Sequence, residues 1–162
     1  MLVAFLLTRR AASPLFILLA VGGEKTTYFV TTLIVRRPRP DVPTIGARHV
    51  TSSFPSGHVG SSVSLYGSIA ILVLMHSRHR SVGARAVAVG LVAIIATVVA
   101  YCRMYRGFHF LTDVVVGSLI GAVWLPIALR LVALLPDKRH GAGEVSRTRH
   151  QRRRADASRS AV

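Results

Sequence analysis

Long apolar runs dominate the pattern of hydrophobic and polar positions along this chain. Three of these runs contain no Asp, Glu, Lys or Arg: Val59–Met75, Ala86–Cys102 and Val114–Leu129. Each is close to the roughly 20 residues that an α-helix needs to cross the hydrocarbon core of a bilayer. A fourth run, Ala11–Val35, is interrupted only by Glu24-Lys25. The pattern predicts an all-α fold, a multi-pass transmembrane bundle of about four spanning helices.

The alternative interpretation is a soluble bundle of unusually apolar helices. Because three successive runs leave no polar face for water, the membrane interpretation is favoured. Met1–Leu7 is also apolar but too short to span, and it lacks the basic leader and the small-residue cleavage site of a signal peptide. We interpret this segment as a partial N-terminal helix.

The chain carries a formal net charge of +15 in 162 residues. Residues 137–162 hold eight Lys or Arg and three acids without apolar periodicity, which predicts a disordered basic tail after a membrane domain at 1–136. Such a tail typically sets topology or binds anionic lipid headgroups. Nucleic-acid binding is the disfavoured alternative, because no aromatic residues interleave the charges. The single cysteine, Cys102, excludes an internal disulfide.

Charge also predicts the topology, because loops rich in Lys and Arg stay in the cytoplasm. Arg9-Arg10, the loop 76–85 and the basic tail are then cytoplasmic, and four crossings place 36–58 and 103–109 together on the outer side. Those outer segments are basic too, against the charge rule, and binding an anion would explain why. Their arginines are Arg36, Arg37, Arg39, Arg48, Arg103 and Arg106.

Two of the chemically unusual segments flank the first outer loop. Arg39-Pro40 follows the first run, where the prolines stop a helix and a guanidinium can bind phosphate oxygens in a bidentate manner. Pro55-Ser56-Gly57-His58 opens the next helix, whose free N–H groups favour an anion. We expect Ser53 to cap this helix and His58 to lie in its first turn.

The third segment, Arg103-x5-His109-x3-Asp113, is the most specific. His109 and Asp113 are four residues apart, which on a helix places them on one face. A carboxylate that bonds one imidazole nitrogen leaves the other as a nucleophile. Taken alone, such a pair is more often a capping contact, and an Arg-Pro pair is often only a helix stop. Together, on one side of the membrane, the three segments predict one anion pocket at the water boundary.

In this order the three motifs resemble the phosphatidic acid phosphatase type 2 superfamily, which also includes soluble acid phosphatases and vanadium haloperoxidases. The resemblance covers about residues 11–135, and the apolar runs indicate the membrane lipid phosphatase branch. It implies that His109 attacks phosphorus to form a phosphohistidine, that Asp113 orients His109, and that His58 protonates the leaving oxygen and then activates water. It implies no metal and no cofactor. The residues implied to hold the phosphate are Arg39, Arg103, Ser56 and the Gly57 amide.

The chain departs from the family pattern at its first motif. The family has a lysine seven residues before Arg39, where this chain has Thr32, and we expect the Thr32 hydroxyl to contribute to phosphate binding. Lys25 lies two turns earlier, roughly 10 Å away by helix rise, and is not expected to replace that lysine. The family's membrane members typically have six crossings, so the chain resembles a form shortened from six.

The resulting hypothesis is a multi-pass cell-membrane phosphatase that hydrolyses a lipid phosphate or diphosphate. Its active site faces the extracytoplasmic side and its tail the cytoplasm. Prenyl phosphates or diphosphates (such as undecaprenyl diphosphate), phosphatidate and phosphatidylglycerol phosphate all remain compatible. The alternatives are phosphoryl transfer to an acceptor other than water, and an impaired relative that only binds lipid phosphate. The expected partners are the substrate and membrane lipids, with no nucleic acid, and the oligomeric state is left open.

Overall fold

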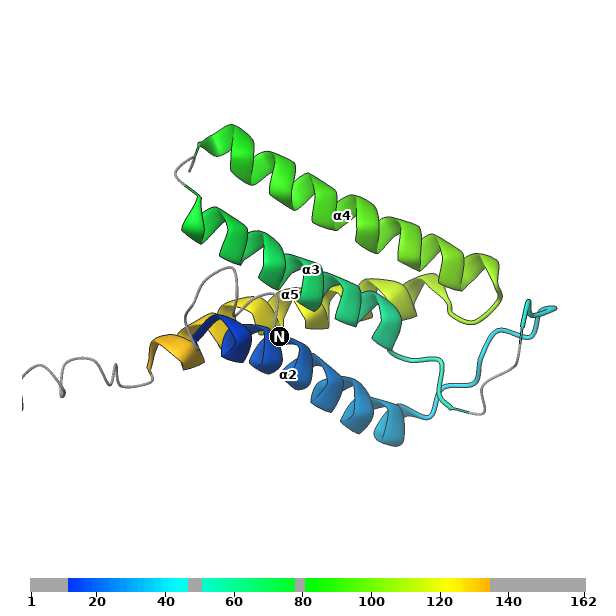
Figure 1. Ribbon diagram of the computed structural model, residues 1–162. Coiled ribbons are helices and arrows are strands. Elements are labelled where there is room, and N and C mark those ends of the chain that lie inside the picture. Colours follow the sequence, from blue (N-terminus) through cyan, green and yellow to red (C-terminus); the bar gives the residue numbers. More distant parts are fainter. Residues whose placement is uncertain (1–11, 47–50, 78–80, 135–162) are drawn as a thin grey trace, which may run out of the picture. The chain divides into compact units, whose positions relative to one another are not determined.

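The structure, a computed structural model, describes residues 12–46, 51–77 and 81–134. Over these residues the chain is helical and contains no strand. Its elements are α2 (Ala12–Val35), α3 (Gly57–His76), α4 (Val82–Tyr105) and α5 (Leu111–Ala133), which alternate in direction (Figure 1). The predicted all-α bundle is confirmed. The partial N-terminal helix, Arg9-Arg10, Arg48 and the basic tail lie outside the described residues.

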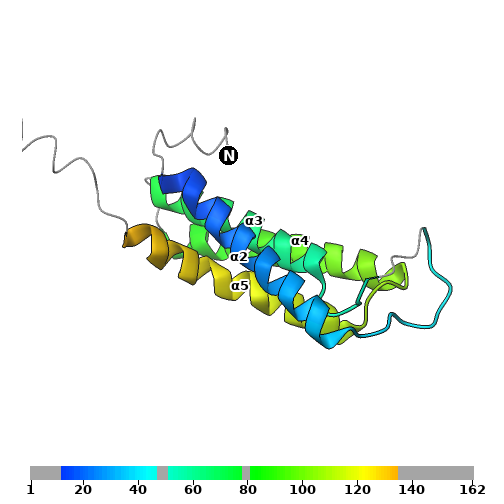
Figure 2. The same cartoon turned by 90° about the horizontal axis from the view of Figure 1, so that it is seen from below.

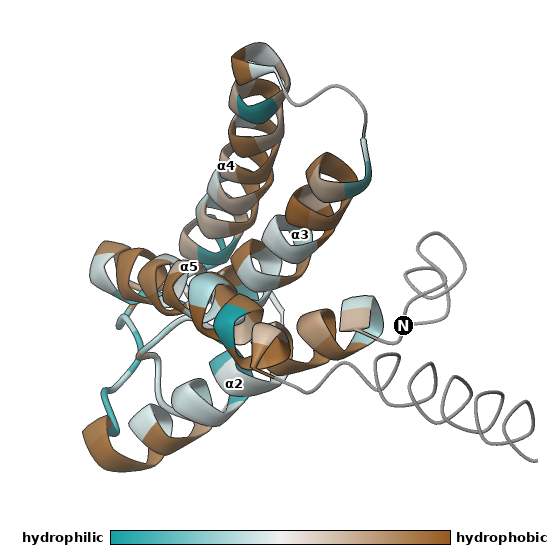
Figure 3. Ribbon diagram, turned by 90° about the vertical axis from the view of Figure 1, so that its left-hand side faces the viewer, coloured by the Kyte–Doolittle hydropathy of each residue, from teal (hydrophilic) through white to brown (hydrophobic). Residues whose placement is uncertain are grey.

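Three of the four helices, α3, α4 and α5, are long and apolar enough to cross a membrane. The fourth predicted crossing, α2, has the length, at 24 residues, but not the same hydropathy. Figure 3 shows the reason, because α2 carries pale and teal stretches where α4 and α5 are mostly brown. Its sequence interrupts the apolar residues with two glycines, Glu24-Lys25 and two pairs of threonines.

The helix α4 shows the surface expected of a lipid-facing segment. Its buried residues are only Ala96 and Arg103, whereas Val87, Val89 and Ile94 are among its exposed apolar side chains. A helix that is apolar all round and yet unburied suits hydrocarbon rather than water. The distribution therefore supports the membrane interpretation of the apolar runs.

Glycines bring α5 into close contact with α3. A Cβ on Gly117 would overlap the carbonyl oxygen of Ser56, and one on Gly121 would overlap that of Gly60. The Gly117-x3-Gly121 pair therefore serves helix packing. The close approach also presses the start of α5 against the segment that leads into α3.

Polar contacts join α2 to its neighbours inside the bundle. The buried Glu24 accepts a hydrogen bond of 2.8 Å from the Ser61 hydroxyl of α3. From α5, the indole N–H of Trp124 donates to the Thr27 hydroxyl at 2.9 Å. This charged position in an apolar run therefore has a structural partner.

The ends of the four helices bring the three motif segments together. Figures 1 and 2 both show the loop after α2 and the turn between α4 and α5 at the same end of the bundle. Backbone hydrogen bonds join them, from Ser53 N to the Arg37 carbonyl (2.9 Å) and from Ser56 N to the Asp113 carbonyl (2.9 Å). The prediction that these distant segments share one end of the bundle is confirmed, whereas the side of the membrane that they face stays a prediction.

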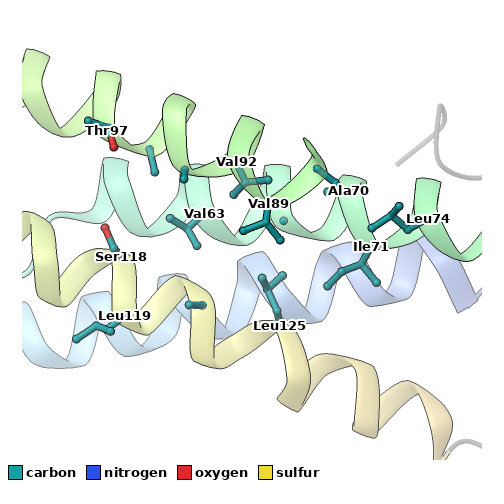
Figure 4. A pocket seen from close by; sticks show the side chains of 15 residues that line it. Val63, Ala70, Ile71, Leu74, Val89, Val92, Thr97, Ser118, Leu119 and Leu125 are labelled. Atoms are coloured by element: carbon teal, nitrogen blue, oxygen red, sulfur yellow. The ribbon is translucent and has the colours of Figure 1, made fainter. Parts of the chain in front are cut away.

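An apolar cavity of about 520 Å³ lies between α3, α4 and α5 (Figure 4). Its walls are aliphatic apart from the hydroxyls of Thr97 and Ser118, which lie toward the end of the bundle that carries the motifs. From α3 it is lined by Val63, Gly67, Ala70, Ile71 and Leu74.

Candidate active site

His109 lies in the turn between α4 and α5 and is buried, with 6% of its surface exposed. Its Nδ1 is 2.7 Å from the backbone carbonyl oxygen of Ser53. Because a carbonyl oxygen only accepts, this contact assigns the proton of a neutral ring to Nδ1 and leaves the lone pair on Nε2.

The protonation state of His109 follows from its surroundings. Burial lowers the pKa of His109 to about 4, and the positive charges of Arg39 and Arg103 act in the same direction against the Ser53 hydrogen bond and Asp113. The imidazole is therefore neutral at neutral pH. A neutral ring with Nδ1 protonated presents Nε2 as a nucleophile.

Asp113, on the first turn of α5, is completely buried. Its Oδ2 accepts from the backbone N–H of Phe110 at 2.8 Å and lies 3.7 Å from His109 Nδ1. The sequence prediction gave the imidazole hydrogen bond to Asp113, but the structure gives it to the Ser53 carbonyl. Asp113 instead places a negative charge beside that bond and holds the turn that carries His109.

Arg37 is the partner of Asp113 that the motif analysis did not single out. Its Nη1 donates to Asp113 Oδ1 at 2.8 Å and to the Thr112 hydroxyl at 2.7 Å. The guanidinium carbon also lies 4.2 Å from the centre of the Phe110 ring. The only signal in the sequence was the basic Arg36-Arg37-Pro38-Arg39 cluster, which does not say which arginine turns inward.

Arg39, the arginine predicted from the first motif, joins two parts of the site. Its Nη1 donates to the Phe108 carbonyl at 2.9 Å, and its Nε donates to the Thr51 carbonyl at 3.2 Å. These bonds place the Arg39 guanidinium beside the turn that carries His109.

Phe108 is surrounded by positive charge. Its buried ring lies 4.6 Å from the guanidinium carbon of Arg103, 4.8 Å from that of Arg106 and 5.8 Å from that of Arg39. The faces of aromatic rings attract cations, so one side chain holds three arginines at one place. The sequence predicted that Arg39 and Arg103 converge but gave no role to Phe108.

Ser56, rather than Ser53, occupies the N-cap position of α3, and its side chain makes no capping hydrogen bond. The predicted cap, Ser53, is four residues before the helix and donates its hydroxyl to the Pro38 carbonyl at 2.9 Å instead. Gly57 is the first residue of the helix, and a Cβ there would lie 2.9 Å from the Tyr28 ring. His58 follows in the same turn and is exposed.

Three buried polar atoms have no hydrogen-bond partner within the described residues: Thr32 Oγ1, Ser56 Oγ and Arg103 Nε. A buried polar group without a partner costs about 1–3 kcal/mol, and native structures contain few. All three belong to residues that the sequence predicted to hold phosphate. Thr32 is one helical turn beyond Tyr28 on α2, on the face that meets Gly57.

A family model decides the relationship that the motifs suggested. The model of the PAP2 superfamily matches residues 13–136, which include every motif residue described above. The chain belongs to the PAP2 superfamily.

Relatives in this superfamily agree with the membrane branch that the apolar runs indicated. Over 113 residues the chain is 31% identical to phosphatidylglycerophosphatase B of Bacillus subtilis, an alignment that covers 70% of this chain and 55% of the relative. It is 28% identical over 115 residues to lipid phosphate phosphatase delta of Arabidopsis thaliana, an alignment that covers 64% of this chain and 27% of that relative. The chain thus spans about half, or less, of these relatives.

Two solved structures share the fold. The transmembrane PAP2-type phosphatidylglycerolphosphate phosphatase from Bacillus subtilis superposes with a TM-score of 0.72 at 26% identity, over 85% of this chain and 67% of that one. LpxE from Aquifex aeolicus gives a TM-score of 0.60 at 28% identity, over 80% and 74%. The helical arrangement of this chain is therefore that of membrane PAP2 phosphatases.

Proposed function

We propose that this chain is an integral membrane phosphatase that hydrolyses a lipid phosphate or diphosphate through a phosphohistidine on His109. The proposal is carried by the buried polar atoms of Thr32, Ser56 and Arg103 that have no partner among the described residues, together with a neutral His109. Phosphate oxygens would accept hydrogen bonds from all three atoms. Relatives whose names include phosphatidylglycerophosphatase and lipid phosphate phosphatase support the same class of reaction.

In the first step, Nε2 of His109 attacks phosphorus and the bond from phosphorus to the lipid oxygen breaks. His58 in its protonated form gives its proton to that oxygen, so the lipid leaves as an alcohol, or as a monophosphate if the substrate was a diphosphate. The imidazole of His109 gains positive charge as the bond forms. The Ser53 carbonyl and the Asp113 carboxylate, 2.7 and 3.7 Å from Nδ1, stabilise that charge.

In the second step, water attacks the phosphohistidine. His58, now neutral, takes a proton from the water, inorganic phosphate leaves, and His109 returns to its neutral state. Phosphoryl transfer depends mostly on positioning and on stabilising charge over the non-bridging oxygens. The groups proposed for that role are Thr32, Ser56, the Gly57 amide at the start of α3, Arg39 and Arg103.

The hydrocarbon part of the substrate is assigned to the apolar cavity between α3, α4 and α5. Thr97 and Ser118 at one end of this cavity lie five or six residues from Arg103 and Asp113 along their helices, roughly 8–9 Å by helix rise. A lipid phosphate bound at the motif residues would reach the cavity with its first carbons. The charge pattern supports a position for this site on the outer face of the membrane.

The test is phosphate release from purified protein in mixed micelles, with prenyl phosphate, prenyl diphosphate, phosphatidate and phosphatidylglycerol phosphate as separate substrates. We expect turnover of at least one lipid and a loss of about 10³-fold or more with His109→Ala, since the nucleophile is removed. The matched histidine control is His76→Ala, at the far end of α3, where Nδ1 of His76 is hydrogen-bonded to the Leu72 carbonyl. Release of phosphate by His109→Ala at the rate of the unmodified protein would refute the proposal.

A trapping experiment separates hydrolysis from the alternatives. We expect acid-labile phosphate bound to His109 after rapid mixing. At later times we expect equal amounts of dephosphorylated lipid and free phosphate. A deficit of free phosphate would indicate transfer to another acceptor. Binding of every lipid without any turnover would instead support the impaired, lipid-binding relative.

A further inference from the structure

Arg106 belongs to the group of cations around Phe108 but has no place in the mechanism above. Its guanidinium carbon is 4.8 Å from the centre of the Phe108 ring, as close as that of Arg103 at 4.6 Å. Building on the proposed function, we propose that Arg106 is a specificity-determining residue that binds a second phosphate group of the substrate, next to the phosphate that is transferred.

Two arginines at this ring, Arg103 and Arg106, carry positive charge that the described carboxylates do not balance. In the part of the chain that the structure describes, neither Arg103 nor Arg106 forms an ion pair, and the buried Asp113 is paired with Arg37. Guanidinium groups on one ring repel one another, since like charges at this separation are not fully screened. An anion with more than one negative charge would relieve this repulsion at a single site.

The contacts of Arg106 fix its position while leaving most of its donors available. Its Nε donates to the Ile45 carbonyl at 3.0 Å, and among the described residues no hydrogen bond uses its Nη groups. A carboxylate partner would instead have occupied the Nη groups. The two Nη groups can therefore donate to phosphate oxygens in the bidentate manner that suits arginine.

The backbone near Arg106 is shaped to admit it. Gly46 has a φ of 106°, and a Cβ at this position would lie 2.6 Å from Nη2 of Arg106. A side chain at residue 46 would be strained by its backbone and would also displace the guanidinium. The Ile45 N–H also donates to the Arg106 carbonyl at 3.3 Å, so this loop holds both ends of the residue.

The distances indicate how the second phosphate relates to the first. The distance between the guanidinium carbons of Arg103 and Arg106 cannot exceed the sum of their distances to the centre of the Phe108 ring. Arg103 is buried, whereas Arg106 is partly exposed. A substrate with two phosphate groups close together would place one at each arginine, the transferred phosphate at the buried Arg103 and the second at Arg106. Either a diphosphate or the phosphodiester beside the terminal phosphate of phosphatidylglycerol phosphate meets this condition.

The experiment compares two matched pairs of lipids with the full chain: prenyl diphosphate against prenyl monophosphate, and phosphatidylglycerol phosphate against phosphatidate. We expect Arg106→Gln to lower kcat/KM for the lipid with two phosphates in at least one pair by about tenfold or more, and for its one-phosphate partner by at most about threefold. Arg106→Lys, which keeps the charge, should recover part of the loss.

The control is Arg36→Gln, which removes the same charge from the same end of the bundle. The Arg36 side chain is exposed, and within the described residues its one hydrogen bond is to the Leu33 carbonyl, so its loss should change kcat/KM equally for both lipids of a pair. A selective loss in the first pair shows that Arg106 binds the second phosphate of a diphosphate. A selective loss in the second pair shows that it binds the phosphodiester of phosphatidylglycerol phosphate. A selective loss in both pairs shows that it binds both groups. An equal loss within both pairs, or no loss, would overturn the assignment to Arg106.

Failure of this inference is distinguishable from failure of the proposed function. If the unmodified protein releases phosphate from none of the four lipids, the phosphatase proposal fails. If it releases phosphate and Arg106→Gln does not discriminate within either pair, only the role of Arg106 fails. Thermal unfolding of the variant, expected to match that of the unmodified protein within a few degrees, excludes a general loss of structure.

Discussion

Replacing Arg37 by Gln tests the contact that holds the two ends of the site together. Arg37 follows α2, and Asp113 is on the first turn of α5, so their ion pair joins segments 76 residues apart in sequence. Gln at position 37 keeps a polar side chain but leaves the Asp113 carboxylate buried without an opposing charge. We expect the bundle to lose stability and the turn that carries His109 to lose its fixed position.

The magnitude follows from the burial of the two partners. Removing one partner of a fully buried ion pair costs roughly 3–5 kcal/mol. Asp113 is completely buried, but 34% of the Arg37 side chain is exposed, and Asp113 keeps its hydrogen bond from the Phe110 N–H. We therefore expect Arg37→Gln to lower the free energy of unfolding by about 2–3 kcal/mol, below the fully buried range. Arg37→Lys keeps the charge but loses the contact of the guanidinium with the Phe110 ring and one of the two hydrogen bonds, so about half of this loss should remain.

The assay is unfolding in mixed micelles by increasing sodium dodecyl sulfate, followed by circular dichroism. Arg36→Gln is the control, because the adjacent Arg36 side chain is exposed and makes one backbone hydrogen bond, for which about 0.5–1 kcal/mol is expected. A double-mutant cycle with Asp113→Asn isolates the pair itself. If Arg37→Gln costs no more than Arg36→Gln, or if the cycle shows no coupling, the reasoning about this ion pair is wrong.

Three further predictions follow from the same geometry. The His109 ring should stay neutral as the pH falls through 6.5 and should become half cationic only near pH 4, which the signals of its ring nitrogens, identified by their loss in His109→Ala, would report. Activity that needs the neutral ring should persist to that pH, and a ring that is half cationic near pH 6.5 contradicts this prediction. Gly117→Ala should lower the free energy of unfolding by about 1–3 kcal/mol, because its Cβ would overlap the Ser56 carbonyl. Gly22→Ala, with open space around the residue, should raise the free energy of unfolding by about 1 kcal/mol, and equal changes in the two variants contradict the packing argument. Thr32→Val should leave stability unchanged or slightly raised but lower kcat/KM for a lipid phosphate about tenfold, and unchanged kinetics would remove Thr32 from the site.

Helix positions could be predicted from the sequence because the apolar runs report them directly. The uncharged run Val59–Met75 became α3 at Gly57–His76, and Val114–Leu129 became α5 at Leu111–Ala133. A segment that crosses a bilayer must form its backbone hydrogen bonds within itself, so length and hydropathy are enough to locate it as a helix. The convergence of the motif segments followed from the alternating direction of the helices.

The hydrogen bonds within the site could not be predicted in the same way. The expected contact between His109 and Asp113 assumed that both lie on one helix, but α5 begins at Leu111 and His109 precedes it. The four-residue spacing therefore does not place the two side chains on one helical face, and the Ser53 carbonyl accepts the hydrogen bond from the imidazole instead. A backbone carbonyl leaves no signal in the sequence, because every residue has one.

The first motif shows how the structure distributes positive charge when the family lysine is absent. Lys25 does reach α3, where its ammonium donates to the Gly57 carbonyl at 3.2 Å. Carbonyl groups of a helix point toward its C-terminus, whereas the N–H groups available to an anion point out of its N-terminus. Lys25 is thus held on the carbonyl side of the first turn of α3, away from the N–H groups that an anion would contact, and Thr32 offers only a hydroxyl. The cationic groups at the other side of the site are Arg39 after α2 and Arg103 and Arg106 at the end of α4, all near the Phe108 ring. We therefore expect these arginines, rather than the first motif alone, to bind most of the substrate charge.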